Sequence, residues 1–417
     1  MNEIVNRPEY LNRLIEYRGS DVIKVITGIR RCGKSTLMAL YSDYLRAQGT
    51  ADENIIRMNL ESLRWRQLRD ASSLYDHLAA QMGGAGKKYL LLDEVQAVPG
   101  WERAVESLRL DFDADVTITG SNAFLLSSEL STLLSGRYVE IRMLPLSFRE
   151  FLDFYEFPPD TSREERFARY VQIGGMPGLR QFGANVPRMM DALEGIYSTV
   201  ILKDVMARAR LADQTALRKI VLFLLDNIGS LVSPGSIGKT LANESAFGEA
   251  RARPRSLAPQ TVEKYIQLLT DAFIFYKAER WDVRGKQLLK TLHKLYAADL
   301  GFRGMLLGFR DADRGRLLEN VVYLELLRRD YRVFVGKLGD TEIDFVAEKP
   351  DRKLYIQVTE SMTGEATRER ELKPLRTVPD HYEKVVLSMD RDPNTSYEGI
   401  HSLNIIDFLL REGSFAI

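Results

Sequence analysis

The sequence predicts an α/β protein that begins with a five-stranded parallel sheet covered by helices. Short runs rich in valine, isoleucine and leucine have the composition of strands buried on both faces. Segments with helical spacing of apolar residues separate these runs, and this alternation is typical of a parallel sheet. The five expected strands are Val22–Gly28, Glu53–Leu60, Lys88–Val95, Asp115–Ser121 and Tyr138–Leu144.

Helical patterns dominate after the last of these strands. Pro145 interrupts the chain and Ser147 is a candidate N-cap for the next helix. Residues 148–211 have helical spacing, broken at the turn Ile173–Gly178. Three helical segments and a β-ribbon follow, an order that fits a winged helix, and from residue 316 helices and strands alternate again.

Length, charge and cysteine content exclude several classes of protein. A chain of 417 residues is expected to form two to four folding units. The 58 basic residues balance the 58 acidic ones, so overall charge indicates neither a nucleic-acid nor a membrane partner. One cysteine excludes internal disulfides and multi-cysteine zinc sites. With no signal peptide and no long apolar run, we expect a cytoplasmic protein without membrane contact.

A phosphate-binding motif follows the first expected strand. The sequence from Gly28 to Ser35 matches G-x-x-x-x-G-K-[ST]. Gly28 and Gly33 allow backbone amides to turn toward phosphates, Lys34 supplies a positive charge, and Ser35 offers a hydroxyl to Mg²⁺. An ordinary glycine-rich turn would not need the lysine and the serine. The residues expected to bind ATP are Gly28, Ile29, Arg30, Arg31, Cys32, Gly33, Lys34, Ser35 and Thr36.

An acidic pair ends the third expected strand. Asp93 follows an apolar run, which places its carboxylate at the strand end where open α/β sheets bind ligands. We expect Asp93 to hold Mg²⁺ and Glu94 to polarise the attacking water, which argues against a nucleoside kinase. A strand–turn acid pair without function is the alternative, and its occurrence together with the phosphate-binding motif makes function the better interpretation.

Other polar residues near the motif are weaker candidates. Ser121 or Asn122 could bond the γ-phosphate or the water, although turn chemistry explains them nearly as well. Arg137 could reach a neighbouring subunit as an arginine finger, or be a solvated loop residue. We interpret the Arg30 and Arg31 side chains as structural or interfacial, and the side chain at position 32 as a small filler.

The strings GIRRCGKSTL, LLLDEVQ, TGSN, SGRY and PLSFREF, in this order, resemble bacterial AAA+ ATPases that carry a DUF4143 region. GGMP is similar to a turn of their helical lid, with Met176 in place of an aromatic residue. The resemblance covers nearly the whole chain. It implies a P-loop AAA+ core at 1–146, a helical lid at 147–212, a winged-helix-like segment at 213–300 and a restriction-endonuclease-like domain at 301–417.

The same resemblance assigns roles to residues. It maps Gly28–Ser35 to Walker A, Asp93 and Glu94 to Walker B, and Ser121 or Asn122 to sensor 1. Arg137 falls on the family's glycine–arginine position, and the family implies a ring, possibly a hexamer. Arg180 is a candidate for sensor 2, which we do not otherwise place.

The C-terminal strands have the layout of a metal-dependent nuclease. Asp344 would be the first metal carboxylate, with Glu319 on the preceding helix as a helper. Gln357 and Thr359 occupy the positions where cleavage requires a carboxylate and a lysine. We therefore expect a scaffold or DNA-docking domain without nuclease activity, in which Asp344 is a relic or a structural hydrogen bonder.

Two basic stretches suggest DNA contact by the winged-helix-like segment. Glu249–Ser256 and Glu279–Lys294 combine basic with apolar or aromatic residues, as phosphate-contacting wings do. Packing inside the ATPase or binding of a protein is the alternative. The leading hypothesis is an oligomeric ATPase that remodels or moves on DNA. A nucleotide switch controlling a protein partner and an ATP-dependent nuclease remain as alternatives.

Overall fold

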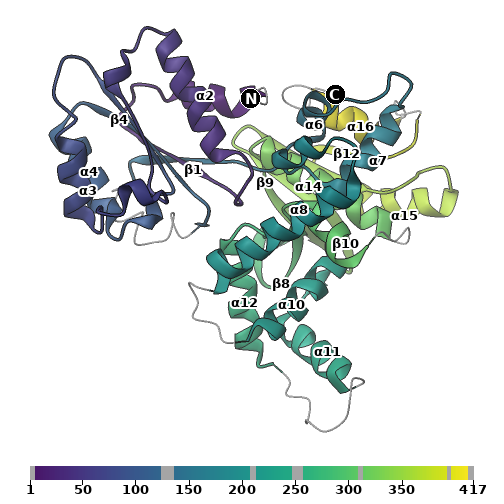
Figure 1. Cartoon of the computed structure of the whole chain (residues 1–417). Coiled ribbons are helices and arrows are strands. Elements are labelled where there is room, and N and C mark those ends of the chain that lie inside the picture. The colour runs from purple at the N-terminus through teal and green to yellow at the C-terminus, as the bar shows by residue number, and fades with distance from the viewer. Residues whose placement is uncertain are drawn as a thin grey trace. The chain divides into compact units, whose positions relative to one another are not determined.

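The computed structural model of the protein describes residues 5–123, 136–206, 213–246, 257–308, 313–391 and 396–411. The chain divides into two compact units (Figure 1). The first comprises residues 1–145 with 271–273, and the second residues 146–270 with 274–417. The predicted bounds of the four domains stay predictions.

The first unit contains a five-stranded parallel sheet, which confirms the predicted fold class. Its strand order is β2-β3-β4-β1-β5, and every pairing is parallel. Each strand overlaps one of the five apolar runs in the sequence. The strands are β1 (Ile23–Thr27), β2 (Ile55–Asn59), β3 (Lys88–Asp93), β4 (Ala114–Gly120) and β5 (Tyr138–Arg142).

Helices cover both faces of this sheet, which explains why its central strands are buried and rich in apolar residues. β1 and β3 are buried at every position. Helix α2 lies on one side of the sheet, and α3 and α4 lie on the other (Figure 1). The helices are α1 (Pro8–Glu16), α2 (Lys34–Ala47), α3 (Ala71–Ala79) and α4 (Trp101–Asp111), with short 3-10 turns at Asp52–Asn54, Leu63–Trp65 and Val95–Ala97.

The second unit begins with helices and ends with a mixed sheet. Ser147 caps α6 as predicted, since its hydroxyl accepts a hydrogen bond from the backbone N–H of Glu150, 3.0 Å away. The helices are α6 (Phe148–Phe154), α7 (Arg163–Ile173), η5 (Pro177–Phe182), α8 (Val186–Thr199), η6 (Val200–Met206), α10 (Gln214–Asp226), α11 (Pro234–Ala246), α12 (Pro259–Asp271), α13 (Leu300–Leu307), α14 (Arg314–Arg328), α15 (Glu365–Arg376) and α16 (Ile405–Leu410).

The mixed sheet has nine strands in the order β13-β14-β12-β11-β10-β9-β7-β8-β6. The β7–β8 ribbon, predicted as the wing of a winged helix, joins this sheet because β7 pairs with β9 in parallel. The sheet is therefore continuous across residue 300. Its strands are β6 (Leu231–Val232), β7 (Phe275–Asp282), β8 (Gln287–Ala297), β9 (Arg332–Leu338), β10 (Thr341–Lys349), β11 (Arg352–Val358), β12 (Glu383–Ser388), β13 (Ser396–Tyr397) and β14 (Ile400–Asn404).

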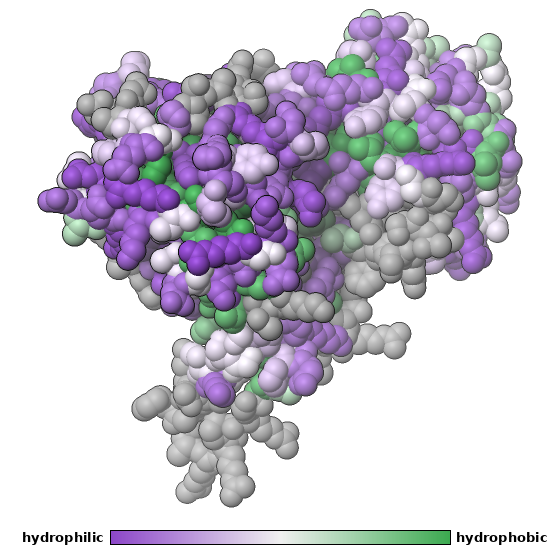
Figure 2. All heavy atoms as spheres, turned by 180° about the vertical axis from the view of Figure 1, so that it is seen from behind, coloured by the Kyte–Doolittle hydropathy of each residue, from purple (hydrophilic) through white to green (hydrophobic). Residues whose placement is uncertain are grey.

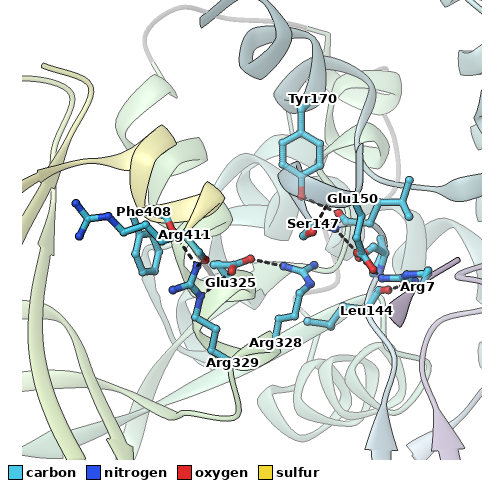
Figure 3. A network of polar contacts seen from close by, with 12 residues as sticks. Arg7, Leu144, Ser147, Glu150, Tyr170, Glu325, Arg328, Arg329, Phe408 and Arg411 are labelled. Carbon is cyan, nitrogen blue, oxygen red and sulfur yellow. Dashed lines mark hydrogen bonds and ion pairs between the residues drawn. The ribbon is translucent and has the colours of Figure 1, made fainter. Parts of the chain in front are cut away.

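Buried charges join α14 to the end of the chain's last described helix, α16. Glu325 accepts from the guanidinium groups of Arg328 and Arg329, each at 2.7 Å (Figure 3). Arg329 also donates to the carbonyl oxygens of Phe408 and Arg411, at 2.7 and 3.1 Å. The guanidinium thus closes the carboxyl end of α16, where backbone carbonyls have no partner within the helix.

In the described part of the chain, no helix is both long and apolar enough to cross a lipid bilayer. The face of the molecule in Figure 2 is mostly hydrophilic, with hydrophobic residues in separate smaller areas. Most large apolar side chains are instead buried, as the hydrophobic core within each unit requires.

Candidate functional site

The loop between β1 and α2 has a backbone that only glycine accommodates at two positions. Gly28 and Gly33 have φ angles of 143° and 109°. A Cβ atom on Gly28 would lie 2.1 Å from the carbonyl oxygen of Met143, which follows β5. Arg31 has a φ of 71°, so the loop also bends at a residue that carries a side chain. The loop therefore turns tightly between the end of β1 and the start of α2.

The first turn of α2 carries the charged and hydroxyl groups of the motif. Lys34 is buried, and its ammonium group donates to the carbonyl oxygens of Gly28 and Ile29 at 2.9 and 3.2 Å. Ser35 and Thr36 are exposed. The lysine thus lies inside the loop while the hydroxyl groups face outward.

The other side chains of the loop have structural partners. The guanidinium of Arg30 makes two hydrogen bonds to Glu61, each of 3.2 Å, whereas Arg31 is exposed. Cys32 is completely buried, and burial raises the pKa of its thiol. A neutral buried thiol behaves as a small apolar residue.

Arg7 holds the loop in place and was not predicted. Its guanidinium donates to the carbonyl oxygen of Cys32 at 3.1 Å. It also donates to the carbonyl oxygen of Leu144 at 2.9 Å (Figure 3). It also lies 3.4 Å from the carbonyl oxygen of Pro145. Arg7 therefore ties the loop to the segment after β5. No sequence pattern marks it, because its partners are backbone atoms far along the chain.

The acidic pair at the end of β3 is buried and hydrogen bonded. The hydroxyl of Thr119 donates to one carboxylate oxygen of Asp93, and the amide of Asn59 donates to the other at 3.2 Å. Glu94 has a φ of 54°, its backbone N–H donates to Thr119 at 3.0 Å, and its carboxylate accepts from Gln96. Thr119 thus bonds both acids, although it was not singled out from the sequence.

The loop and the acidic pair lie at the same edge of the sheet. Thr27 is paired with Gly120 and Asn59 with Asp93, so the carboxyl ends of β1, β4, β3 and β2 are adjacent. Ser121 follows β4 and is completely buried, and its hydroxyl makes no hydrogen bond to the described residues. The neighbouring Asn122 is buried as well. The motif residues that follow β1, β3 and β4 therefore lie together at the carboxyl-terminal end of the parallel strands.

Two further arginines, Arg137 and Arg180, were predicted from the sequence to serve the site. Arg137 is exposed and precedes β5, and its carbonyl accepts from the N–H of Ile23 at the start of β1. It is therefore separated from the loop of its own chain by the length of β1, roughly 17 Å. Arg180 belongs to η5 in the second compact unit.

The nuclease-like positions form a cluster in the second unit. Asp344 and Glu319 both lie beside the ammonium group of Lys294, at 3.8 and 2.9 Å. Gln357 accepts from the backbone N–H of Asp344 at 2.8 Å and donates to Glu371, and Thr359 is buried. Among the described residues, no three His, Cys, Asp or Glu side chains are arranged to share one metal ion.

The basic stretches differ from the sequence interpretation in one respect. The predicted basic stretch Glu249–Ser256 lies outside the described residues. In the β7–β8 hairpin, Arg284 and Lys286 are exposed. Lys294, counted as a phosphate-contacting residue, is buried against carboxylates and cannot serve that purpose.

The strand order, the loop after β1 and the acidic pair after β3 together define a P-loop ATPase fold of the AAA type. Residues 20–152 match the sequence model of the AAA domain, and residues 164–313 match a domain of unknown function, DUF8612. The expected DUF4143 label is not confirmed.

A protein of Haemophilus influenzae is 41% identical over 410 residues, which is 98% of this chain and 99% of that protein. The chain belongs to the same family as that protein, a family of AAA-type P-loop ATPases. A protein of Methanocaldococcus jannaschii is 27% identical over 407 residues, covering 94% of this chain and 85% of the relative.

The structure is similar to that of a Walker-type ATPase of Pyrococcus abyssi. The TM-score is 0.50 at 14% identity, and the match covers 72% of this chain and 95% of the other. At this identity the similarity shows a shared fold.

Proposed function

We propose that the protein hydrolyses ATP with Mg²⁺ at the edge of the sheet where the loop after β1 and the pair Asp93–Glu94 meet. The observation that carries this proposal is that β1 and β3 have their carboxyl ends at the same end of the sheet, with only β4 between them. A triphosphate held by the loop would therefore place its terminal phosphate toward the acids.

Each residue has a role that its surroundings support. The backbone of residues 28–36 binds the phosphates, and Lys34 supplies positive charge to them. Ser35 and Asp93 hold Mg²⁺, and Asp93 fits this role because its two oxygens retain lone pairs beyond the bonds from Thr119 and Asn59. When bound there, Mg²⁺ would neutralise part of the negative charge of the phosphates.

Glu94 orients the attacking water, and Ser121 or Asn122 bonds the γ-phosphate or that water. The buried hydroxyl of Ser121 supports this role, since a buried polar group that bonds none of the described residues is costly unless a ligand engages it. Gln96 holds the Glu94 carboxylate in this structure, so Glu94 must exchange this bond for one to water during turnover.

We further propose that the protein is a cytoplasmic ring oligomer, possibly a hexamer, which couples hydrolysis to remodelling of DNA or movement on it. The exposed Arg137 lies at the amino-terminal end of the strands, whereas the loop lies at their carboxyl-terminal end. It is therefore suited to act on a neighbouring subunit. The exposed Arg284 and Lys286 at the tip of the β7–β8 hairpin are suited to contact phosphates of the DNA backbone. The winged-helix-like segment and a DUF4143-type domain without cleavage activity remain part of this proposal.

The ATPase rate measured with single-stranded, duplex and branched DNA, beside a mass measurement in ATP, tests the proposal. We expect one of the DNAs to raise the rate several-fold, with less stimulation at high salt because phosphate contacts release counterions. Glu94→Gln should retain ATP binding, and its rate of hydrolysis should be lower by a factor of roughly 10² or more. This variant serves as the control for contaminating ATPases.

Other outcomes of this experiment identify the alternatives. Slow hydrolysis that no DNA changes would contradict a motor and favour a nucleotide switch that controls a protein partner. DNA cleavage lost on Asp344→Asn would establish an ATP-dependent nuclease. Normal hydrolysis by Glu94→Gln would show that another residue orients the water.

A further inference from the structure

A lysine from β8 lies among the carboxylates of the nuclease-like cluster. The ammonium nitrogen of Lys294 is 2.9 Å from Glu319, 2.7 Å from Glu342 and 3.8 Å from Asp344. Glu319 comes from α14, and the two other acids come from β10. The lysine side chain is 5% exposed, against 11%, 34% and 16% for these three acids. Three carboxylates thus converge on one buried cation that belongs to the chain itself.

Local backbone structure directs the acids toward this lysine. In the pairing of β10 with β9, Ile343 opposes Gly336 and Val346 opposes Phe334, so two residues of β10 oppose one of β9. This is a β-bulge, which changes the direction of the side chains within it. Asp344 lies in the bulge, and its carboxylate also accepts from the backbone N–H of Val358 at 2.8 Å.

The remaining partners complete the cluster without a second acid on β11. Tyr296, two residues beyond Lys294 on the same face of β8, donates its hydroxyl proton to Glu319. Gln357 uses its oxygen for the N–H of Asp344 at 2.8 Å and its amide nitrogen for Glu371 at 2.9 Å. Both ends of the glutamine side chain are therefore occupied.

The charges favour a protonated lysine at this place. Burial by itself would lower the pKa of Lys294, but the carboxylates of Glu319, Asp344 and Glu342 raise it above its usual value. Burial, together with repulsion from Glu319, raises the pKa of Asp344 well above its ordinary range. The ammonium group of Lys294 therefore stays charged among these acids, although it is buried.

The same geometry leaves little room for a metal ion. Carboxylate oxygens bind Mg²⁺ at about 2.0–2.1 Å and Ca²⁺ at about 2.3–2.6 Å, usually six or more oxygens to an ion. The point that lies among these three acids is the position of the ammonium nitrogen. A divalent ion could enter only if the lysine left, and the lysine would then be a buried cation without its acids.

We propose that the ammonium group of Lys294, which β8 brings into the sheet of the nuclease-like domain, permanently replaces the divalent cation of a metal-dependent nuclease, so that no metal binds among these acids. The inference rests on the proposed nuclease-like assignment of residues 301–417 and is independent of the ATPase site.

Binding of Mn²⁺ by the full chain without nucleotide tests the proposal. Wild type and Lys294→Met are titrated with Mn²⁺ and followed by electron paramagnetic resonance, with the thermal midpoint as a second readout. We expect Lys294→Met to bind one more Mn²⁺ per chain than wild type. It should melt at a lower temperature without Mn²⁺ and regain several degrees when Mn²⁺ is added, because the ion restores the lost positive charge.

Two further variants make the result specific. Lys294→Met combined with Glu319→Gln should lose the additional Mn²⁺, whereas any binding at the loop after β1 should be the same in all variants. If Lys294→Met does not fold, Lys294→Gln with Glu342→Gln removes one charge of each sign, and it should still gain the ion through Glu319 and Asp344.

The proposal is overturned if wild type already binds an ion that Glu319→Gln removes. It is equally overturned if a folded Lys294 variant gains no Mn²⁺. Neither result depends on ATP hydrolysis, so a failure of the proposed ATPase activity and a failure of this inference are distinguishable.

Discussion

At the loop between β1 and α2, backbone angles and the space around each residue limit which amino acids can be present. Gly28 combines a φ of 143° with a carbonyl oxygen 2.1 Å from the place of a Cβ atom. That oxygen belongs to Met143, whose N–H is bonded to Thr27 at 2.8 Å. The obstacle is therefore held by the sheet and cannot move away as a flexible side chain would.

We expect Gly28→Ala to lower the free energy of unfolding by about 2 kcal/mol or more, because it adds backbone strain and a steric clash. ATP binding should be lost in the same variant, since the loop can no longer close around phosphates. Denaturant unfolding and a nucleotide-binding titration measure the two effects. Gly83→Ala is the matched control, because nothing lies within 4 Å of its Cβ position. Similar stability of both variants would contradict this reading of the loop.

At the scale of elements, one buried carboxylate joins a turn to a helix. Asp299 accepts from the N–H of Gly175 at 2.7 Å and from that of Gly301 at 2.8 Å. It thereby caps the start of α13 and holds the turn Ile173–Gly178. A Cβ atom on Gly174 would lie 1.8 Å from this carboxylate, so the glycines that suggested a turn are also required by close packing. Burial raises the pKa of Asp299 to about 7.

This carboxylate should make stability depend on pH. Between about pH 4 and pH 7 the native carboxyl holds a proton that the unfolded one has lost, so stability falls as pH rises through about 7. Asp299→Asn lacks this titration, and its melting temperature should fall less between pH 5 and pH 8 than that of wild type. At pH 5 the variant should be less stable by about 1–3 kcal/mol, because the amide nitrogen cannot accept one of the two N–H bonds.

Asp213→Asn is the matched control for this comparison, because Asp213 is an exposed N-cap that accepts from Ala216 at 2.9 Å. Its pH profile should follow that of wild type. Equal pH profiles of Asp299→Asn and wild type would show that Asp299 does not titrate in this range.

At the scale of the whole molecule, the proposed ring depends on Arg137. Because this arginine lies on the sheet edge opposite the loop, we expect it to act only on the site of a neighbouring subunit. Arg137→Ala should lower the ATPase rate by roughly 10³. Mixing it with inactive Lys34→Ala subunits should restore part of the rate, since some intact loops then face an intact arginine.

Arg103→Ala, which removes an exposed arginine from α4, serves as the control and should retain the wild-type rate. If the mixture stays inactive while mass measurements show mixed oligomers, Arg137 has only a local role in its own chain.

The sequence was sufficient for the first sheet and for the residues at its edge. Each strand leaves a local signal, because a strand buried on both faces is rich in apolar residues. The phosphate-binding loop is contiguous in the chain, and the acids follow directly after an apolar run. Since parallel strands place their carboxyl ends together, these local signals also predicted that the loop and the acidic pair share an edge.

The partners of those residues depended on the tertiary structure. Arg7 bonds carbonyl oxygens, which every residue type has, and therefore leaves no pattern. Lys294 was interpreted as part of a basic surface run, but the pairing of β7 with β9 brings β8 into the C-terminal sheet and buries this lysine among acids. Alternation along a strand tells which side chains share a face, and only the folded sheet decides which neighbours they meet there.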